Sequence, residues 1–209
     1  MLGLGNSLTG GTVLGWTPAE IPSLIHWYRK GVGQESDSGT SNTNCDLWTD
    51  QEGSNNLTAN GTNDALAPTL NANGTITFDA NTDIMTWGTA LSLGKFSIYV
   101  RLSYGAALGN DYIMENQADS VNWIQLTSET LVKVRITDRQ DYTMDPVIPE
   151  NGTPFNLGAE RAENGDIAVF HAGDGMEKTG IGDGNVPIST LFPLTTIGDP
   201  ATDSTWYEV

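Results

Sequence analysis

The chain has few cysteines, few basic residues and no long apolar run, and each scarcity excludes a class of protein. Its single cysteine, Cys45, excludes an internal disulfide and a cysteine-rich zinc site. Nine basic and 26 acidic residues give a formal net charge of −17, so most of the surface would repel DNA, RNA and anionic membranes. No stretch approaches the roughly 18 apolar residues of a membrane span. We therefore expect neither a nucleic acid nor a membrane as a partner.

Strong helix-forming sequence is also scarce. The 209 residues include 24 glycines and 9 prolines, and only 17% of residues are charged. Stretches rich in Asn and Thr separate short apolar segments, a composition that disfavours an α-bundle or a coiled coil. The length suits one domain with a short appendage, because all-β sandwiches commonly reach this size. We expect an arm at 1–17 and a single domain at 18–209.

The arm at 1–17 has no charged side chain and contains five glycines. It lacks the basic start and the unbroken apolar run of a signal peptide, so secretion is not indicated. Glycine makes the segment costly to order alone, yet its large side chains are too apolar for a solvated tail. We expect an extended arm that orders against a partner; folding back on its own domain, or disorder, is the alternative. The expected partner-binding residues are Leu2, Leu4, Leu8, Val13, Leu14 and Trp16.

From Pro22 onwards, apolar and polar residues alternate with a period of two, which is typical of half-buried antiparallel strands. The best candidates lie at 95–103 and 130–137. Others lie at 23–29, 75–78, 84–87, 112–115, 121–127, 155–160, 167–171 and 205–209, and only 18–23 or 189–192 suits a helical turn. The inward positions predict a core of Phe78, Phe96, Ile98, Val100, Leu102, Val132, Val134, Ile136, Ile167 and Val169.

Turn residues agree with this pattern. Asn-Gly pairs occur at 60–61, 73–74, 151–152 and 164–165, and both residues of such a pair accept the positive φ of a tight hairpin. About ten strands with little helix predict an all-β fold of two antiparallel sheets packed as a sandwich.

The order of the segments is more specific than any one of them. An apolar strand at 24–28 is followed by Trp48-Thr49-Asp50, then by a strand ending in Phe78-Asp79, then by Phe96-Ser97-Ile98-Tyr99. Similar later segments lie at 167–175, 194–198 and 206–209. This succession resembles the concanavalin A-like, laminin-G-like jelly-roll family over 21–209. The resemblance implies a jelly-roll domain and specifies no activity.

The first eight residues, Met-Leu-Gly-Leu-Gly-Asn-Ser-Leu, resemble the start of structural proteins in tailed phages of marine cyanobacteria. This resemblance implies a non-enzymatic virion component, such as a capsid decoration, a fibre or a tail-associated protein. Its partners would be other capsid or tail proteins and further copies of itself, and its location would be the virion.

Patterns for catalysis and for cofactors are weak. A retaining glycoside hydrolase on this fold needs carboxylates about 5 Å apart on one strand, as in Glu-x-Asp-x-Glu, and the chain's Glu-x-Asp at 35–37 lies in a loop-like sequence. We expect no catalytic residue and no cofactor, with calcium at 174–177 and 183–185 as an alternative to ordinary Asp, Asn and Gly turns. We interpret Asp46, Asp50 and Glu52 as solvated carboxylates, and His26 and His171 as hydrogen-bonded sheet residues.

Two binding hypotheses remain open. Five basic residues occupy outward positions in or beside the two best strands, and they predict a basic stripe that docks an acidic neighbour; plain strand solubilisation is the alternative. These residues are Lys95, Arg101, Lys133, Arg135 and Arg139. The second functional hypothesis is a lectin-like adhesion module. It needs an exposed Trp or Tyr beside an Asp or Asn, and the six tryptophans allow it.

Overall fold

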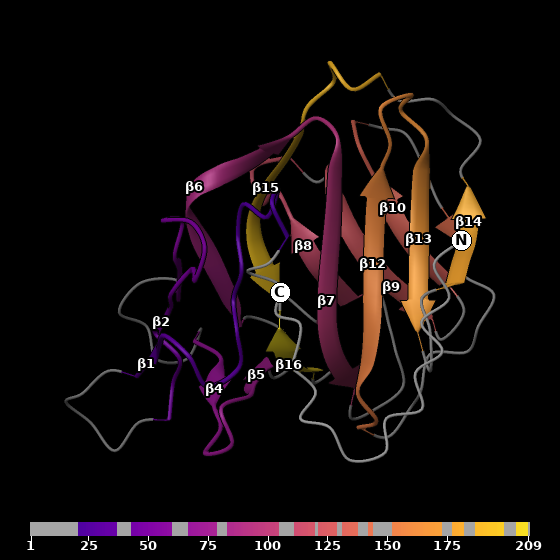
Figure 1. The fold of residues 1–209 in the computed structure, drawn as a ribbon. Helices are drawn as coiled ribbons and strands as arrows, with labels where there is room; N and C mark the ends of the chain where they lie inside the picture. The colour runs from indigo at the N-terminus through magenta and orange to yellow at the C-terminus, as the bar shows by residue number, and fades with distance from the viewer. Residues whose placement is uncertain are drawn as a thin grey trace, which may run out of the picture.

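Two antiparallel sheets packed face to face form the domain (Figure 1). Figure 1 shows β7, β12 and β13 in front, with β8, β9 and β10 behind them. The computed structural model describes residues 21–36, 43–59, 67–78, 83–104, 111–119, 121–128, 131–137, 142–143, 152–172, 177–181, 187–198 and 204–208. Within these residues there is no helix, and the predicted all-β jelly-roll sandwich is confirmed.

The front sheet has seven strands in the order β14-β13-β12-β7-β16-β5-β4. Its long central strand β7 pairs with β12 over seven residues, so the middle of this sheet is the most regular part of the fold. The strands span Thr69–Leu70 (β4), Ile76–Phe78 (β5), Phe96–Tyr104 (β7), Phe155–Arg161 (β12), Ile167–Ala172 (β13), Glu177–Ile181 (β14) and Ser204–Glu208 (β16).

The rear sheet has nine strands in the order β1-β2-β3-β6-β15-β8-β9-β10-β11. Strand β6 turns directly into β7 and so connects the two sheets. The strands span Gln34–Glu35 (β1), Leu47–Trp48 (β2), Leu57–Ala59 (β3), Ile84–Leu93 (β6), Asp111–Glu115 (β8), Trp123–Ser128 (β9), Leu131–Arg135 (β10), Tyr142–Thr143 (β11) and Phe192–Gly198 (β15).

The core lies between the sheets and contains all ten residues that the alternation predicts. Nine of them are buried, and Ile98 is partly buried against the same cluster. Aromatic pairs reinforce the packing, with Phe96 and Phe192 joining the two sheets at a centroid distance of 5.4 Å. Removal of this apolar surface from water is the main source of stability in a fold with no disulfide.

Two predictions about local structure are wrong for identifiable reasons. Residues 23–29 form no strand, because their backbone groups bond to side chains and loop backbone instead of a neighbouring strand. Residues 189–192 form no helical turn; Phe192 begins β15, and β14 was not expected at all. Pro193 obscures β15 in the sequence. It is tolerated because it pairs with β6 alone, whereas the β8 pairing begins at Thr196.

The Asn-Gly turns use one left-handed residue where two were expected. Gly74 and Gly165 have φ of +82° and +86°, whereas no Asn in the described residues has a positive φ. In each turn the glycine N–H donates to the carbonyl three residues before it, at 2.8 Å and 2.9 Å. These are three-residue hairpin loops with glycine in the left-handed position. Both residues of the pair at 60–61 and Asn151 of the pair at 151–152 lie outside the described residues, and Gly152 has a φ of +76°.

Candidate functional site

Asp50 is a buried carboxylate that bonds to five different residues. Its side chain is fully buried, and His26 Nδ1 lies 2.7 Å from its Oδ2 atom. Its carboxylate also accepts four backbone hydrogen bonds at 3.0 to 3.2 Å, from the N–H groups of Trp27, Glu52, Gly53 and Asn55. The interpretation of Asp50 as a solvated carboxylate is therefore wrong. Glu52 is exposed, as expected, and Asp46 is half-buried.

This arrangement makes Asp50 an anchor and not an acid. Burial alone would raise the pKa of Asp50, but the hydrogen bonds from Gly53, Trp27, His26 and Glu52 lower it below the ordinary value of 3.8. The carboxylate is thus held ionised, with its lone pairs directed at donors. His26 is hydrogen-bonded as predicted, but it lies in a loop and not in a sheet. His171 lies in β13 as predicted, and its side chain is outside the description.

An aromatic network completes the attachment of this loop. Trp48 Nε1 donates to the Arg29 carbonyl at 3.0 Å, and the Tyr28 ring packs edge-on against Trp48 at 5.8 Å. Trp87 Nε1 donates to the Tyr28 hydroxyl at 2.9 Å, and that hydroxyl donates to the Asn55 carbonyl. The Trp48-Thr49-Asp50 motif therefore has a structural explanation. The side chains of Trp48 and Asp50 hold residues 27–29 against the rear sheet, although these residues make no strand pairing with it.

The richest group of polar and aromatic side chains lies on the outer face of β8, β9 and β10. Strand register places Tyr112, Gln125 and Lys133 in one row. The adjacent row contains Glu115, Trp123 and Arg135. We call these six residues the β8–β10 face.

Contacts within the β8–β10 face are tight. The Arg135 guanidinium lies 4.9 Å from the Trp123 ring centroid, a cation–π distance, and Tyr112 meets Trp123 edge-on at 6.0 Å. Trp123 and Gln125 are each 6% exposed, whereas the other four residues are half-buried. The face therefore offers hydrogen-bonding groups at its surface and keeps its indole inside.

The β8–β10 face does not supply the carboxylate pair of a glycoside hydrolase. Glu115 has uncharged register neighbours on both sides, Thr196 and Trp123. Both Thr195 and Thr196 place their hydroxyls near the Glu115 carbonyl, at 3.3 Å and 3.4 Å. A retaining mechanism needs a second carboxyl group about 5 Å away, and the described part of this face presents none in those rows.

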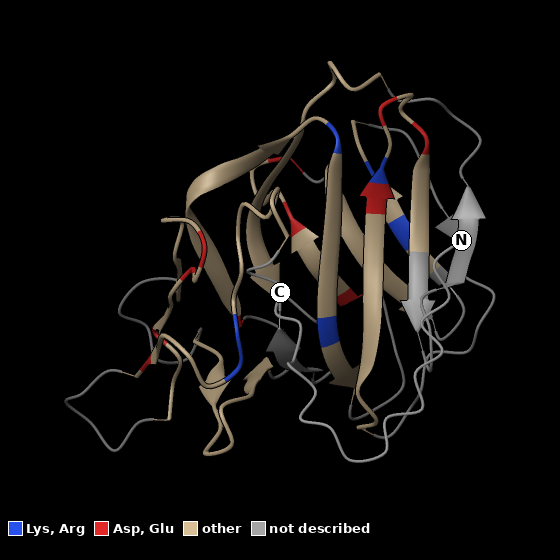
Figure 2. Cartoon of the chain, in the orientation of Figure 1, with Lys and Arg blue, Asp and Glu red and all other residues tan. Residues whose placement is uncertain are grey.

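The predicted basic stripe is wrong because its members lie on opposite sides of the sandwich. Lys95 and Arg101 belong to the front sheet's outer side, whereas Lys133 and Arg135 belong to the β8–β10 face (Figure 2). Lys95 Nζ is also 2.7 Å from Glu163 Oε2, and this hydrogen bond raises the pKa of Lys95. Arg139 lies outside the described residues. Outward positions on two strands form one stripe only if both strands share a sheet.

The four tryptophans whose side chains are described are Trp27, Trp48, Trp87 and Trp123, and all are buried. Of the aromatic side chains that the structure describes, the exposed one is Tyr99 on β7, with 52% of its surface accessible. Sequence reasoning missed Tyr99 as a functional candidate. The signal was present, since Tyr99 occupies an outward position between the inward residues Ile98 and Val100.

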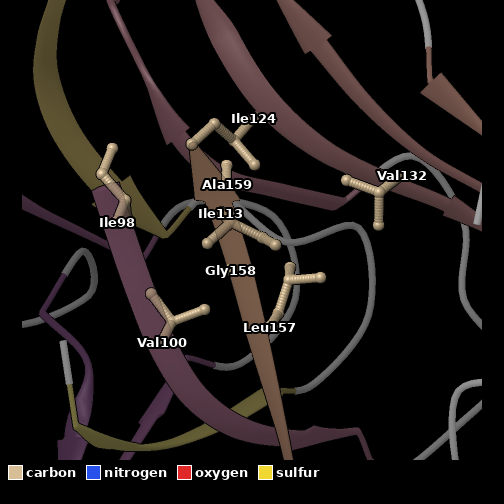
Figure 3. A pocket seen from close by; sticks show the side chains of 8 residues that line it. All are labelled: Ile98, Val100, Ile113, Ile124, Val132, Leu157, Gly158 and Ala159. Carbon is tan, nitrogen blue, oxygen red and sulfur yellow. The ribbon is translucent and has the colours of Figure 1, made fainter. Parts of the chain in front are cut away.

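A gap of about 10 Å³ between the sheets is not a ligand site. Figure 3 shows its lining residues, which come from β7, β12, β8, β9 and β10. This volume is near the minimum for one water, and the apolar lining offers no polar side chain to hold it. We treat the gap as a dry packing space. The lining residues are Ile98, Val100, Ile113, Ile124, Val132, Leu157, Gly158 and Ala159.

Several predicted sites fall on residues beyond the described ranges. These are the arm residues Leu2, Leu4, Leu8, Val13, Leu14 and Trp16 and most of the calcium candidates at 174–177 and 183–185. Among the residues with described side chains, no group of three or more His, Cys, Asp and Glu gathers as metal ligands. Across the same part of the chain, no helix is long and apolar enough to cross a membrane.

No family model matches the chain, and no curated protein matches its sequence. Solved structures do resemble its fold. The binding domain of Paraclostridial Mosquitocidal Protein 1 aligns with a TM-score of 0.50 and 15% identity, over 84% of this chain and 47% of that chain. The Botulinum Neurotoxin Type G receptor-binding domain aligns with a TM-score of 0.48 and 14% identity, over 85% and 46%. The alginate lyase Aly36B aligns with a TM-score of 0.42 and 12% identity, over 72% and 83%.

The chain thus spans about half the length of the two toxin chains that it resembles. At 15% identity, the likeness to the binding domain of Paraclostridial Mosquitocidal Protein 1 concerns the fold alone and assigns no ligand.

Proposed function

We propose that the protein is a non-enzymatic structural component of a virus particle and displays its β-sandwich as a binding module. The observation that carries the non-enzymatic part is that both register neighbours of Glu115, Thr196 and Trp123, are uncharged. Its row supplies aromatic and cationic neighbours, which suit recognition of a polar ligand, and no second carboxylate for hydrolysis.

The placement on a particle is supported by different features. The opening residues resemble phage structural proteins, and the apolar arm at 1–17 would gain by burial against a neighbouring capsid or tail subunit. The rest of the chain carries the whole charge of −17, which would keep closely displayed copies soluble. Homo-oligomers and basic neighbours are the partners that this charge distribution favours.

Deletion of residues 1–16 tests the anchoring role. The shortened protein should keep the circular dichroism spectrum and unfolding curve of the full chain. It should elute as a smaller species on size-exclusion chromatography, and it should no longer be incorporated into particles assembled in its presence. Incorporation at the full-chain level, or unfolding of the shortened protein, would show that the arm is not an anchor.

A reducing-sugar assay tests the non-enzymatic role. Purified protein should release no sugar from laminarin, agar or cell-wall glycans. The Glu115→Gln variant is the matched control, because it keeps the shape of the side chain and removes its charge. Sugar release by the full chain that disappears in Glu115→Gln would overturn the proposal. Release that persists in the variant would point to a contaminating enzyme.

A further inference from the structure

Tyr99 is unusual among the exposed residues of this protein. The large apolar side chains that the described surface exposes are Ile25, Tyr99 and Leu191, and Tyr99 is the aromatic one. It lies on β7 near the centre of the front sheet, and the outer side of that sheet faces the viewer in Figure 1. A flat ring is therefore presented on a regular surface that the pairing of β7 with β12 holds in place.

The residue opposite Tyr99 has no side chain. Strand register pairs Tyr99 with Gly158 on β12, so β12 places no side chain beside the ring; Gly158 itself is buried, and Phe170 of β13 follows it in the same row. Directly paired residues in antiparallel strands lie about 4.5 to 5.5 Å apart, and residues two positions along a strand lie about 7 Å apart. The rows on either side of Tyr99 are therefore within reach of a ligand that rests on its ring.

Those rows carry four different hydrogen-bonding groups. On one side of Tyr99, Ser97 pairs with Glu160. On the other side, Arg101 pairs with Asn156. Ser97 and Arg101 are exposed, and Asn156 and Glu160 are half-buried. We call these residues together with Tyr99 and Gly158 the Tyr99 face.

We propose that the Tyr99 face binds a neutral oligosaccharide, with one sugar ring stacked on Tyr99 and its hydroxyls bonded to the flanking side chains. The proposal rests on the proposed function as a binding module and adds a site and a ligand class. A pyranose has one apolar C–H face and a rim of hydroxyls. An exposed phenol ring surrounded by a hydroxyl, an amide, a guanidinium and a carboxylate complements both parts.

Charge on the Tyr99 face favours a neutral sugar over an acidic one. Its charged residues Arg101 and Glu160 have opposite signs and lie on opposite sides of Tyr99, and strand register adds Glu208 of β16 opposite Arg101, so the face has no excess of positive charge. Figure 2 shows the rest of β7 and β12 mostly without charge. The whole chain carries −17, which would repel uronate or sulfated polymers as they approach.

The area of the Tyr99 face argues against a protein partner. A stable protein interface buries roughly 800 Å² on each side and has several apolar anchors at its centre. Among the described residues on the outer side of the front sheet, Tyr99 is the one exposed large apolar side chain, and the residues that flank it are polar. Such a surface suits one or two sugar rings better than a subunit.

Affinity electrophoresis of the full chain in gels containing neutral polysaccharides tests the proposal. The gels would contain β-glucan, mannan or galactan, with alginate as an acidic comparison. At least one neutral polymer should retard the protein, and alginate should not. Tyr99→Ala should weaken the retardation about tenfold or more, whereas Tyr99→Phe should keep most of it because the ring remains. Leu191→Ala, which removes another exposed apolar side chain, is the matched control and should bind like the wild type.

Three results would overturn the proposal. One is that no neutral polymer retards the full chain, and a second is that Tyr99→Ala binds as well as the wild type. The third is that binding is lost at high salt, which indicates an ionic ligand. Loss of binding in Lys133→Ala, with Tyr99→Ala unaffected, would move the site to the β8–β10 face and leave the binding-module function intact. Absence of the protein from particles would instead refute the virion role and leave the Tyr99 site standing.

Discussion

Replacing Asp50 with alanine is expected to destabilise the sandwich by about 3 kcal/mol. The change removes a carboxylate that accepts four backbone hydrogen bonds and contacts His26 at 2.7 Å. The side chain is fully buried, so the donors that face it are shielded from water at this point. Residues 27–29 should then lose their attachment to the rear sheet.

The magnitude follows from which donors can find water after the substitution. The Trp27 N–H is buried, so losing its charged acceptor costs about 1 to 3 kcal/mol. Glu52 and Gly53 are exposed and His26 is a quarter exposed, so their donors can bond to water at a small cost. Asp50→Asn keeps one acceptor oxygen for Trp27 and loses the charge, so we expect about half of the alanine effect.

Urea unfolding at several pH values separates the contribution of the Asp50 charge to stability from the contribution of its packing. The folded-state pKa of Asp50 is lowered, so its contribution is fully present above the ordinary value of 3.8 and is lost as the pH falls through the lower value. The difference in free energy of unfolding between the wild type and Asp50→Asn should therefore disappear between about pH 5 and about pH 2. A cost below about 1 kcal/mol for Asp50→Ala, or a wild-type advantage that does not change with pH, would refute this account of the loop.

Three further predictions concern the core and the buried polar groups. Val100→Ala or Ile136→Ala should each lower the free energy of unfolding by about 2 to 4 kcal/mol in urea, whereas Ser97→Ala on the outer side of β7 should change it by less than about 0.5 kcal/mol. Burial, with a smaller effect of Asp46, raises the pKa of the Cys45 thiol to about 12, so a thiol reagent at pH 8 should modify Cys45 only after urea unfolds the chain. Arg161 is buried and donates to the carbonyls of Thr190 and Pro187, so Arg161→Met should cost about 2 to 3 kcal/mol; unchanged stability would show that these bonds contribute nothing.

The alternation predicted the core well because burial on one side of a strand is a local property. Val132 and Val134 are inward on β10 and fully buried, as their spacing indicates. Residues 24–28 have a strand-like pattern but form no strand, and the reason is physical. Their apolar character is explained by packing, but the Trp27 N–H donates to the Asp50 side chain, and the next carbonyl group but one, that of Arg29, accepts from the Trp48 side chain; both partners are about twenty residues away. Local spacing carries no information about such distant partners.

The candidate sites were harder to predict because they depend on which strands are neighbours. Outward residues on β7 and β10 read alike in the sequence, yet the two strands belong to opposite sheets. The grouping of Tyr112, Trp123 and Arg135 needs the order β8-β9-β10, and the pairing of Tyr99 with Gly158 needs β12 beside β7. The alternation in the sequence indicates only that Tyr99 points outward.

The pairing of Tyr99 with Gly158 also allows a purely structural role, and stability measurements distinguish it from binding. An aromatic residue opposite a glycine can cover the exposed backbone and strengthen the sheet, and such cross-strand pairs contribute about 0.2 to 1 kcal/mol. If this were the whole role of Tyr99, Tyr99→Ala would lower the free energy of unfolding by that amount and leave retardation by neutral glycans unchanged. A sugar-binding ring predicts loss of retardation in Tyr99→Ala at a temperature where the variant is fully folded. Because Tyr99 is half exposed and outside the core, the variant should fold, so the two measurements can be made on the same protein.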